Sequence, residues 1–186
     1  MTDKDYAASQ VLGDVLASRR SSLYALVPAG KALYTGFEAN GLPQAGLGFA
    51  VGVFPKGGDS AALVQDMRGV LADMLKDGVP GELVEASKRQ EIAQLELEKN
   101  SVSGLANVWS EALAFQGLTS PDDMAQAFRA VSVADVDRVA RAYLDEQHMV
   151  TAVLTPQASG KPISGKGFGG ARSEERRVGE ECRSRW

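Results

Sequence analysis

Two alternating runs joined by one turn place the strongest constraint on the fold of this 186-residue chain. Ala32–Glu38 and Leu47–Phe54 each alternate with the period of two that is typical of a half-buried strand. The segment Asn40–Gly46 between them contains two glycines and a proline, which favour a turn. The sequence therefore predicts two neighbouring antiparallel strands.

Each predicted strand has two unlike faces. The first run separates Leu33, Thr35 and Phe37 from Ala32, Tyr34 and Gly36, and the second separates Leu47, Phe49, Val51 and Val53 from Gly48, Ala50 and Gly52. We expect the bulky face of the second strand to receive helices. Its glycine and alanine face is then bare, or is approached closely by another backbone. A bare face fits the wall of a chamber, and close packing against a partner domain fits the same pattern.

Apolar residues at helical spacing predict helices before and after this strand pair in the sequence. The first helix is Asp5–Ser18, and its buried face is predicted to contain Ala8, Val11, Leu12, Val15 and Leu16. The residues expected to cap later helices are Asp59 or Ser60, Ser120 and Ser132, with Gly78 ending one of them. Met149–Leu154 is a β-branched run that predicts a third strand. The fold class is thus α+β, with a mostly antiparallel sheet and helices packed on one face.

Composition excludes several classes of function. A hydrophobic content of 44% with 24% charged residues fits one soluble globular domain. The net charge of −4 argues against a nucleic-acid partner, and no apolar run is long enough for a membrane segment. Cys182 and His148 are the only residues of their types, so neither an internal disulfide nor a self-contained zinc site is expected.

Two further patterns are weaker candidates for chemistry. One is a run of acidic residues that we interpret as a solvated helix face: Glu82, Glu85, Glu91, Glu96 and Glu98. The other is Gly160–Lys166, which matches the start of a phosphate-binding loop. Gly167 follows where a serine or threonine is required, so nucleotide binding is not expected.

The two ends of the chain differ from the rest. Residues 157–171 form a Gly/Ser/Lys linker, and residues 172–186 switch abruptly to Arg and Glu. This tail resembles a translated sequencing adapter, and we expect it to be non-native or disordered. Residues 1–156 are then the single domain, and its first strand is expected to be missing before Met1.

Three segments share their order and pattern with one known family. The first is SSLYALVPAGKALY, similar to S-R-L-Y-x-x-L-R followed by G-L-A-Y. The second is DGVPGELVEASKR, similar to G-x-x-x-E-L-x-x-A-K, and the third is VSVADVDRVARAYL, similar to V-T-x-x-D-V-x-x-x-A-x-x-Y-L. The succession spans Asp5–Pro156 and resembles the non-catalytic second domain of the insulinase/pitrilysin zinc metallopeptidases (inverzincins).

This resemblance implies domains of α+β type that enclose, in twos or fours, a chamber in which peptides are cleaved. Catalysis in the family uses H-x-x-E-H and a distal Glu to hold zinc and activate water. The sequence contains no H-x-x-E-H, so no catalytic residue, metal ligand or cofactor is assigned to this chain. Zinc is implied only for the parent enzyme.

One substrate-contacting element of the family maps onto this sequence. Many members carry an arginine and a tyrosine seven residues apart, and Tyr34 matches the tyrosine. The resemblance makes Tyr34 a candidate substrate-binding residue, through a hydrogen bond from its hydroxyl. Val27 stands where the arginine is expected, and Ser22 replaces the arginine of S-R-L-Y. The alternative is a Tyr34 packed on the sheet with its hydroxyl bonded locally.

The resulting hypothesis is a fragment of a bacterial-type zinc metalloendopeptidase that supplies a chamber-wall, substrate-binding domain and is inactive alone. Its partners are then the remaining peptidase domains or a partner subunit, and a peptide substrate. Two alternatives stay open: a catalytically inactive subunit that acts by binding and assembly, and a small adaptor whose Gly-rich sheet face binds a peptide strand. The sequence indicates no compartment, since a periplasmic and a cytoplasmic parent fit equally.

Overall fold

The computed structural model describes residues 3–42, 45–145 and 149–155. It divides the chain into two units, Met1–Val150 and Thr151–Trp186, and of the second only residues 151–155 are described. The elements of the first unit follow in the order α1 (Asp3–Ala17), η1 (Tyr24–Leu26), β1 (Tyr34–Leu42), β2 (Ala45–Val53), α2 (Ser60–Asp77), α3 (Gly81–Glu98), α4 (Val102–Ser110), η2 (Glu111–Phe115), α5 (Pro121–Ala130) and α6 (Val133–Tyr143). The predicted α+β class is confirmed.

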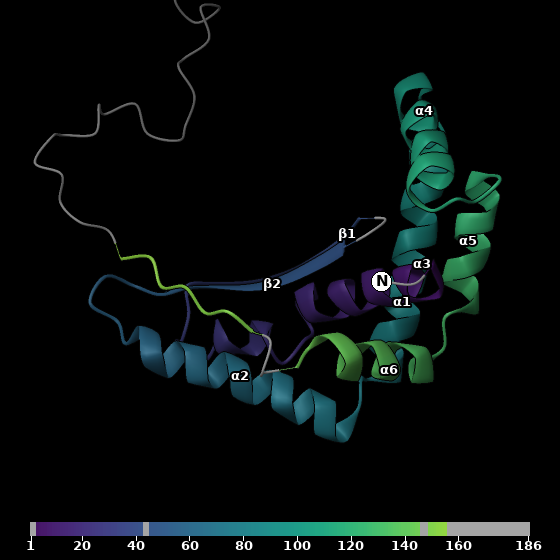
Figure 1. The fold of residues 1–186 in the computed structure, drawn as a ribbon. Coiled ribbons are helices and arrows are strands. Elements are labelled where there is room, and N and C mark those ends of the chain that lie inside the picture. The colour runs from purple at the N-terminus through teal and green to yellow at the C-terminus, as the bar shows by residue number, and fades with distance from the viewer. Residues whose placement is uncertain (1–2, 43–44, 146–148, 156–186) are drawn as a thin grey trace, which may run out of the picture. The chain divides into compact units, whose positions relative to one another are not determined.

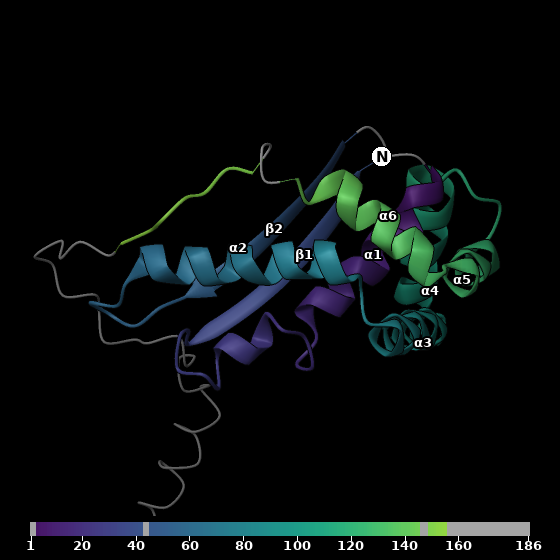
Figure 2. The same ribbon diagram turned by 90° about the horizontal axis from the view of Figure 1, so that it is seen from below.

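Strands β1 and β2 form an antiparallel pair, as the two alternating runs predict. Tyr34 is paired with Val53 at one end, and Asn40 with Leu47 towards the other. Helices α1, α2 and α6 all lie on the same side of this pair (Figures 1 and 2). Helix α1 packs against β1, and α2 packs against β2. The result is a two-layer arrangement in which, among the described residues, no helix packs across the second face of the sheet.

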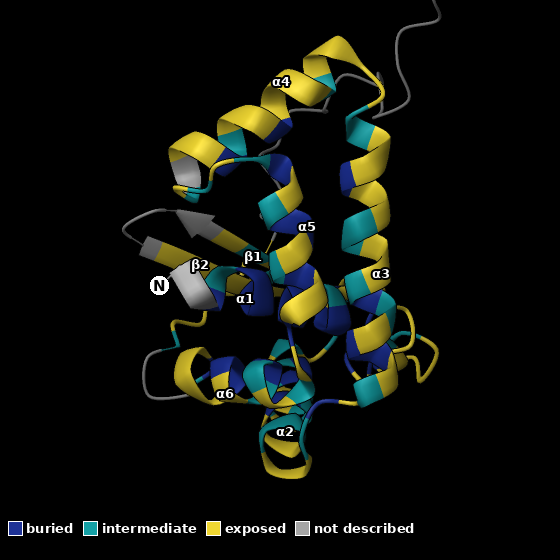
Figure 3. Cartoon of the chain, turned by 90° about the vertical axis from the view of Figure 1, so that its right-hand side faces the viewer, coloured by how far each residue is buried: buried dark blue, intermediate teal, exposed yellow. Residues whose placement is uncertain are grey.

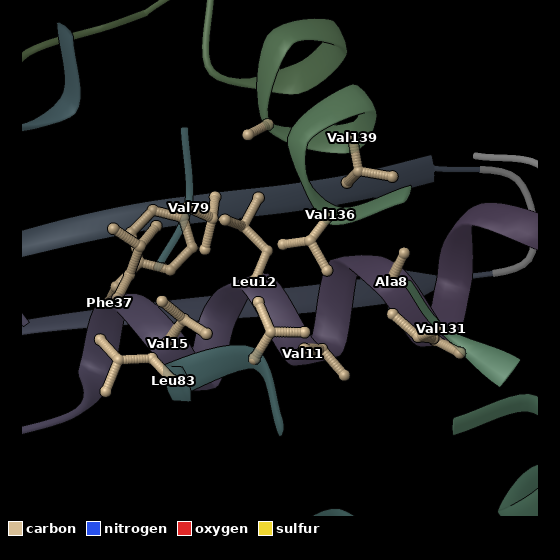
Figure 4. Close-up of a cluster of buried hydrophobic side chains, with 14 of the residues drawn as sticks. Ala8, Val11, Leu12, Val15, Phe37, Val79, Leu83, Val131, Val136 and Val139 are labelled. Atoms are coloured by element: carbon tan, nitrogen blue, oxygen red, sulfur yellow. The ribbon is translucent and has the colours of Figure 1, made fainter. Parts of the chain in front are cut away.

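Helix α1 is the centre of the hydrophobic core. Its predicted apolar face is fully buried, and Val11 and Val15 are among the most enclosed side chains of the described chain. Figure 4 shows these residues between Val136 and Val139 of α6 on one side and Leu83 of α3 on the other. Because α1 touches β1, α3, α5 and α6, it links the sheet to the helical layer.

The helix boundaries follow the predicted caps. The side chain of Asp59 accepts hydrogen bonds from the backbone of Ala61 and Ala62 at 2.9 and 3.0 Å. Ser120 and Ser132 each form a capping box with the aspartate three residues later. Gly78 follows the last residue of α2 with a φ of +87°, a conformation that glycine adopts without strain.

The prediction for the faces of the second strand is wrong. Leu47, Phe49, Val51 and Val53 are exposed at 65%, 37%, 39% and 42%, and the glycine face of β2 receives the helices instead. A Cβ added to Gly52 would lie 2.6 Å from Met67 Sδ, and one added to Gly48 would lie 3.2 Å from Phe37 Cζ. Large side chains from α2 and β1 fill the space on this side, so β2 must contribute small residues there.

The face assigned to Leu33 is also wrong. Leu33 is 63% exposed, whereas Thr35 and Phe37, which the alternation places on the same side, are buried. It precedes the first residue of β1, and Ala32 is the neighbour that turns inward. The alternation of the strand therefore begins later than the sequence pattern indicates.

The predicted third strand is not formed in the described structure. Residues 149–155 are neither helix nor strand, and Val150 and Leu154 are exposed at 95% and 90%. A β-branched run becomes a strand only when a neighbouring strand supplies hydrogen bonds, and in the described residues β1 and β2 pair with each other alone. The predicted linker and tail lie outside the described residues.

Candidate functional site

The candidate site is the face of the β1–β2 pair that no helix covers, which we call the open face. The strand register defines it, because residues paired directly across two strands share one side of a sheet. Its described residues are Tyr34, Gly36, Glu38 and Asn40 of β1, opposite Val53, Val51, Phe49 and Leu47 of β2. Four large apolar side chains in one row on β2 therefore face away from the core.

Tyr34 lies on this open face at its Val53 end. Its side chain is 56% exposed and folds back along its own strand over Gly36. A Cβ added to Gly36 would lie 2.5 Å from the Tyr34 hydroxyl oxygen, so this position of the ring requires glycine at residue 36. No hydrogen bond of the Tyr34 hydroxyl is found within the described residues, and its donor is available to a ligand.

The residues beneath Tyr34 fix the start of β1. The Thr35 hydroxyl is buried and donates a hydrogen bond to the carbonyl oxygen of Leu23 over 3.0 Å. Val27, which stands at the expected arginine position, is partly buried against the core, and Ser22 is exposed. The structure therefore brings no cationic group to Tyr34 from either position.

Most of the acidic residues singled out in the sequence lie on a solvated face of α3, as predicted. Glu82 pairs with Arg20 at 2.8 Å, Glu85 with Lys88 at 2.9 Å and Glu96 with Lys99 at 3.0 Å. Glu98 accepts a hydrogen bond from Gln94 over 2.8 Å. These contacts are exposed surface interactions, which contribute little to stability.

Glu91 is the exception among these acids. Burial between α1 and α3 and the neighbouring Asp14 carboxyl raise the pKa of Glu91 to about 8. Burial also raises the pKa of Asp14, whose Oδ2 atom is enclosed and has no donor when both groups are ionised. Burial therefore favours a protonated carboxyl group in this pair at neutral pH. The sequence pattern missed this pair because Asp14 and Glu91 are distant in the chain.

Neither a metal centre nor a membrane span is present in the part of the chain that the structure describes. No group of three or more His, Cys, Asp or Glu side chains in residues 3–42, 45–145 and 149–155 is arranged to hold a metal ion. No helix within those ranges is both long and apolar enough to cross a bilayer. His148, Cys182 and the segment Gly160–Lys166 lie outside the described residues.

Comparison with known proteins identifies the fold. No protein-family model matches the sequence, and a search of curated protein sequences finds no match. Solved structures do match. A predicted zinc protease from Bordetella pertussis Tohama I is 23% identical with a TM-score of 0.66, and the match covers 77% of this chain and 81% of that one. The inactive peptidase domain of a predicted zinc protease from Bordetella parapertussis is 20% identical with a TM-score of 0.73, covering 86% of this chain and 89% of that one.

A longer relative shows the same fold as one part of a larger protein. A predicted M16-like peptidase from Alicyclobacillus acidocaldarius is 17% identical with a TM-score of 0.64. The match covers 77% of this chain and 34% of that peptidase. The chain therefore has the fold of an M16-like zinc-protease domain. The resemblance to the insulinase/pitrilysin family is confirmed at the level of the fold.

Proposed function

We propose that this chain is a non-catalytic domain of a zinc metalloendopeptidase, and that its open face forms part of the wall of the chamber in which peptides bind. The observation that carries this proposal is the row of exposed apolar side chains on β2, with Tyr34 beside it. Apolar surface of this kind marks a binding surface on a folded domain. The fold shared with zinc-protease domains supports its assignment to peptide binding.

In this proposal the open face binds an extended peptide without cleaving it. Leu47, Phe49 and Val51 contact apolar side chains of the peptide, and the free Tyr34 hydroxyl donates to one of its carbonyl oxygens. Zinc prefers nitrogen and sulfur ligands, and the chain holds one histidine and one cysteine in all. The residues of this chain thus do not fit a peptidase zinc site, and the parent enzyme holds the metal in another domain.

Peptide binding and hydrolysis by the purified chain test the proposal. The probe is a fluorescein-labelled ten-residue peptide rich in Leu and Ser, followed by fluorescence anisotropy and by mass spectrometry after incubation with zinc. We expect binding, no cleavage and no stoichiometric zinc in the protein.

Val51→Ser should weaken binding by roughly tenfold, because it removes apolar contact area from the centre of the row. Val102→Ser is the control, since Val102 is 89% exposed on α4, away from the open face. Zinc-dependent cleavage, or equal binding by Val51→Ser, contradicts the proposal.

A second candidate function is that of a catalytically inactive subunit that acts by assembly. The observation that favours it is helix α4, which is mostly exposed in Figure 3. Leu105, Trp109 and Leu113 are exposed at 40%, 42% and 53% along one side of α4 and η2. An uncovered apolar stripe of this kind suits contact with another peptidase domain. One of the matched structures is itself an inactive peptidase domain.

Sequencing the parent DNA on both sides of this chain separates the two functions. An H-x-x-E-H motif in the same reading frame upstream supports the domain of an active enzyme. A parent gene without that motif supports the inactive subunit.

A further inference from the structure

An open cavity of about 490 Å³ lies where three distant segments meet, and its chemistry points to a ligand of its own. Its walls come from the first half of α1, from β1 and from the junction of α4 with η2. The lining residues are Tyr6, Gln10, Ala39, Asn40, Asn107, Ser110 and Glu111. This volume lies within the range of small-molecule sites in proteins.

Three side chains of this cavity already donate hydrogen bonds within the protein. The Tyr6 hydroxyl donates to Glu111 Oε1 over 2.7 Å, and the Ser110 hydroxyl donates to the carbonyl oxygen of Ala106 over 2.8 Å. The Gln10 side-chain nitrogen donates to the carbonyl oxygen of Ala39 at a longer 3.4 Å. Burial and the Glu111 carboxylate raise the pKa of Tyr6, so its phenol keeps the proton that makes this bond.

The cavity also offers several acceptors. Glu111 has a second carboxylate oxygen, Gln10 has its amide oxygen, and the oxygens of Ser110 and Tyr6 keep lone pairs. Asn40 and Asn107 add an amide oxygen and an amide nitrogen each. A ligand with several donors can therefore bond more than one oxygen of this lining.

The charge around the cavity also limits the kind of ligand that it can bind. Glu111 is the only ionisable lining residue besides Tyr6, and no lysine or arginine is among the lining residues. Glu91 lies within electrostatic reach of Glu111 and adds negative charge when it ionises. A cation is the complementary ligand, and an anion is disfavoured.

We propose that this cavity binds a guanidinium group, as carried by an arginine side chain. A guanidinium is planar, permanently charged and rich in N–H donors, so it can bond a carboxylate and neighbouring neutral oxygens at once. An alkylammonium has fewer donors and a tighter hydration shell, and it binds more weakly here. The site adjoins the open face at Asn40, and it does not depend on the peptidase assignment.

The test uses three capped amino acids that differ only in the side chain: N-acetyl-arginine amide, N-acetyl-lysine amide and N-acetyl-norleucine amide. Each is titrated into the full chain and followed by two-dimensional amide NMR and by calorimetry. We expect the arginine compound to shift the resonances of the cavity residues and to bind at least fivefold more tightly than the lysine compound. The norleucine compound should not bind.

Two variants localise the binding. Glu111→Gln keeps an oxygen for the Tyr6 hydroxyl but removes the charge, and it should weaken arginine binding at least tenfold. Glu85→Gln, on the exposed side of α3, is the matched control and should leave the affinity unchanged. If circular dichroism shows that Glu111→Gln does not fold, Ser110→Ala replaces it, with an expected threefold loss. Equal binding of norleucine, unchanged affinity in the folded variant, or shifts away from the cavity would overturn the proposal.

Discussion

Arg138 donates a hydrogen bond from Nη1 to Asp5 Oδ1 over 2.7 Å, and this bond joins α6 to the start of α1. Tyr143 donates to the second carboxylate oxygen of Asp5 over 3.0 Å. Asp5 is 6% exposed, so its charge depends on these partners. Helix α6 is therefore joined to the central helix α1 by a buried acid with a donor on each oxygen.

Asp5→Ala should destabilise the protein by about 1–3 kcal/mol, because it removes both bonds and leaves Arg138 with only its longer contact to Asp135, at 3.9 Å. Urea unfolding followed by circular dichroism measures the change. Arg141→Ala, on the exposed side of α6, is the matched control and should stay within about 0.5 kcal/mol of the parent chain. Equal midpoints for the two variants would show that the Asp5 contacts do not stabilise the fold.

Gly52→Val should lower the free energy of unfolding by about 1–3 kcal/mol through overpacking. The new side chain would meet Met67 Sδ, which can move, and Leu63 Cδ2 at 3.1 Å, which is held in the core. Gly69→Ala in the middle of α2 is the contrasting variant. A Cβ there meets nothing within 4 Å, so the gain in helix propensity should stabilise the protein by about 0.5–1 kcal/mol. Thermal unfolding of both variants measures the difference, and a stable Gly52→Val would contradict the close approach of α2 to β2.

Stability should decrease as the pH rises from about 4.5 to about 8. The pKa of Glu91 rises from 4.5 to about 8 in the folded chain, so folding favours the protonated carboxyl. The resulting stability is fully present below the unfolded pKa and is lost as the pH rises through the folded value. Glu91→Gln keeps the neutral form, so at pH 9 it should be more stable than the parent chain by about 1–2 kcal/mol.

Urea midpoints between pH 5 and pH 9 measure this pH dependence. The parent chain should lose stability across the range, and Glu91→Gln should lose less. Glu85→Gln, whose carboxylate is exposed on the same helix, should follow the parent chain at every pH. Parallel curves for all three proteins would contradict the raised pKa of Glu91.

Tyr34→Phe should leave stability within about 0.5 kcal/mol of the parent, because the hydroxyl makes no hydrogen bond within the described residues. It should weaken binding of the labelled peptide by about three- to tenfold, the contribution of one hydrogen bond. Gly36→Val is the companion variant, since its side chain occupies the space over which the Tyr34 ring lies. Anisotropy and urea unfolding, measured together, distinguish a binding role of Tyr34 from a packing role. Unchanged peptide affinity in Tyr34→Phe would remove Tyr34 from the proposed site.

The features that sequence reasoning predicted correctly depend on neighbours in the chain. The caps at Asp59, Ser120 and Ser132 are formed by residues two or three positions apart, and the apolar face of α1 repeats within a few turns. Local patterns of this kind specify the helix boundaries without reference to distant segments.

The features that it missed depend on contacts between distant segments. Alternation in Leu47–Phe54 shows that the strand has two faces but does not show which face the helices cover. That depends on the side chains of Met67 and Phe37, which belong to other elements and pack against the glycine face. Asp14 and Glu91 look like surface acids until α1 and α3 enclose them. The cavity at Glu111 is assembled from three segments, so no single sequence motif predicts it.

The row Leu47, Phe49, Val51 and Val53 has a practical consequence for anyone handling this protein. Water beside that row is released whenever a detergent, a fluorescent dye or a neighbouring molecule binds there. The fraction of protein molecules with a bound molecule on this row will therefore vary with concentration, temperature and the additives of each buffer. Assays of one preparation agree with those of another only when these conditions are matched.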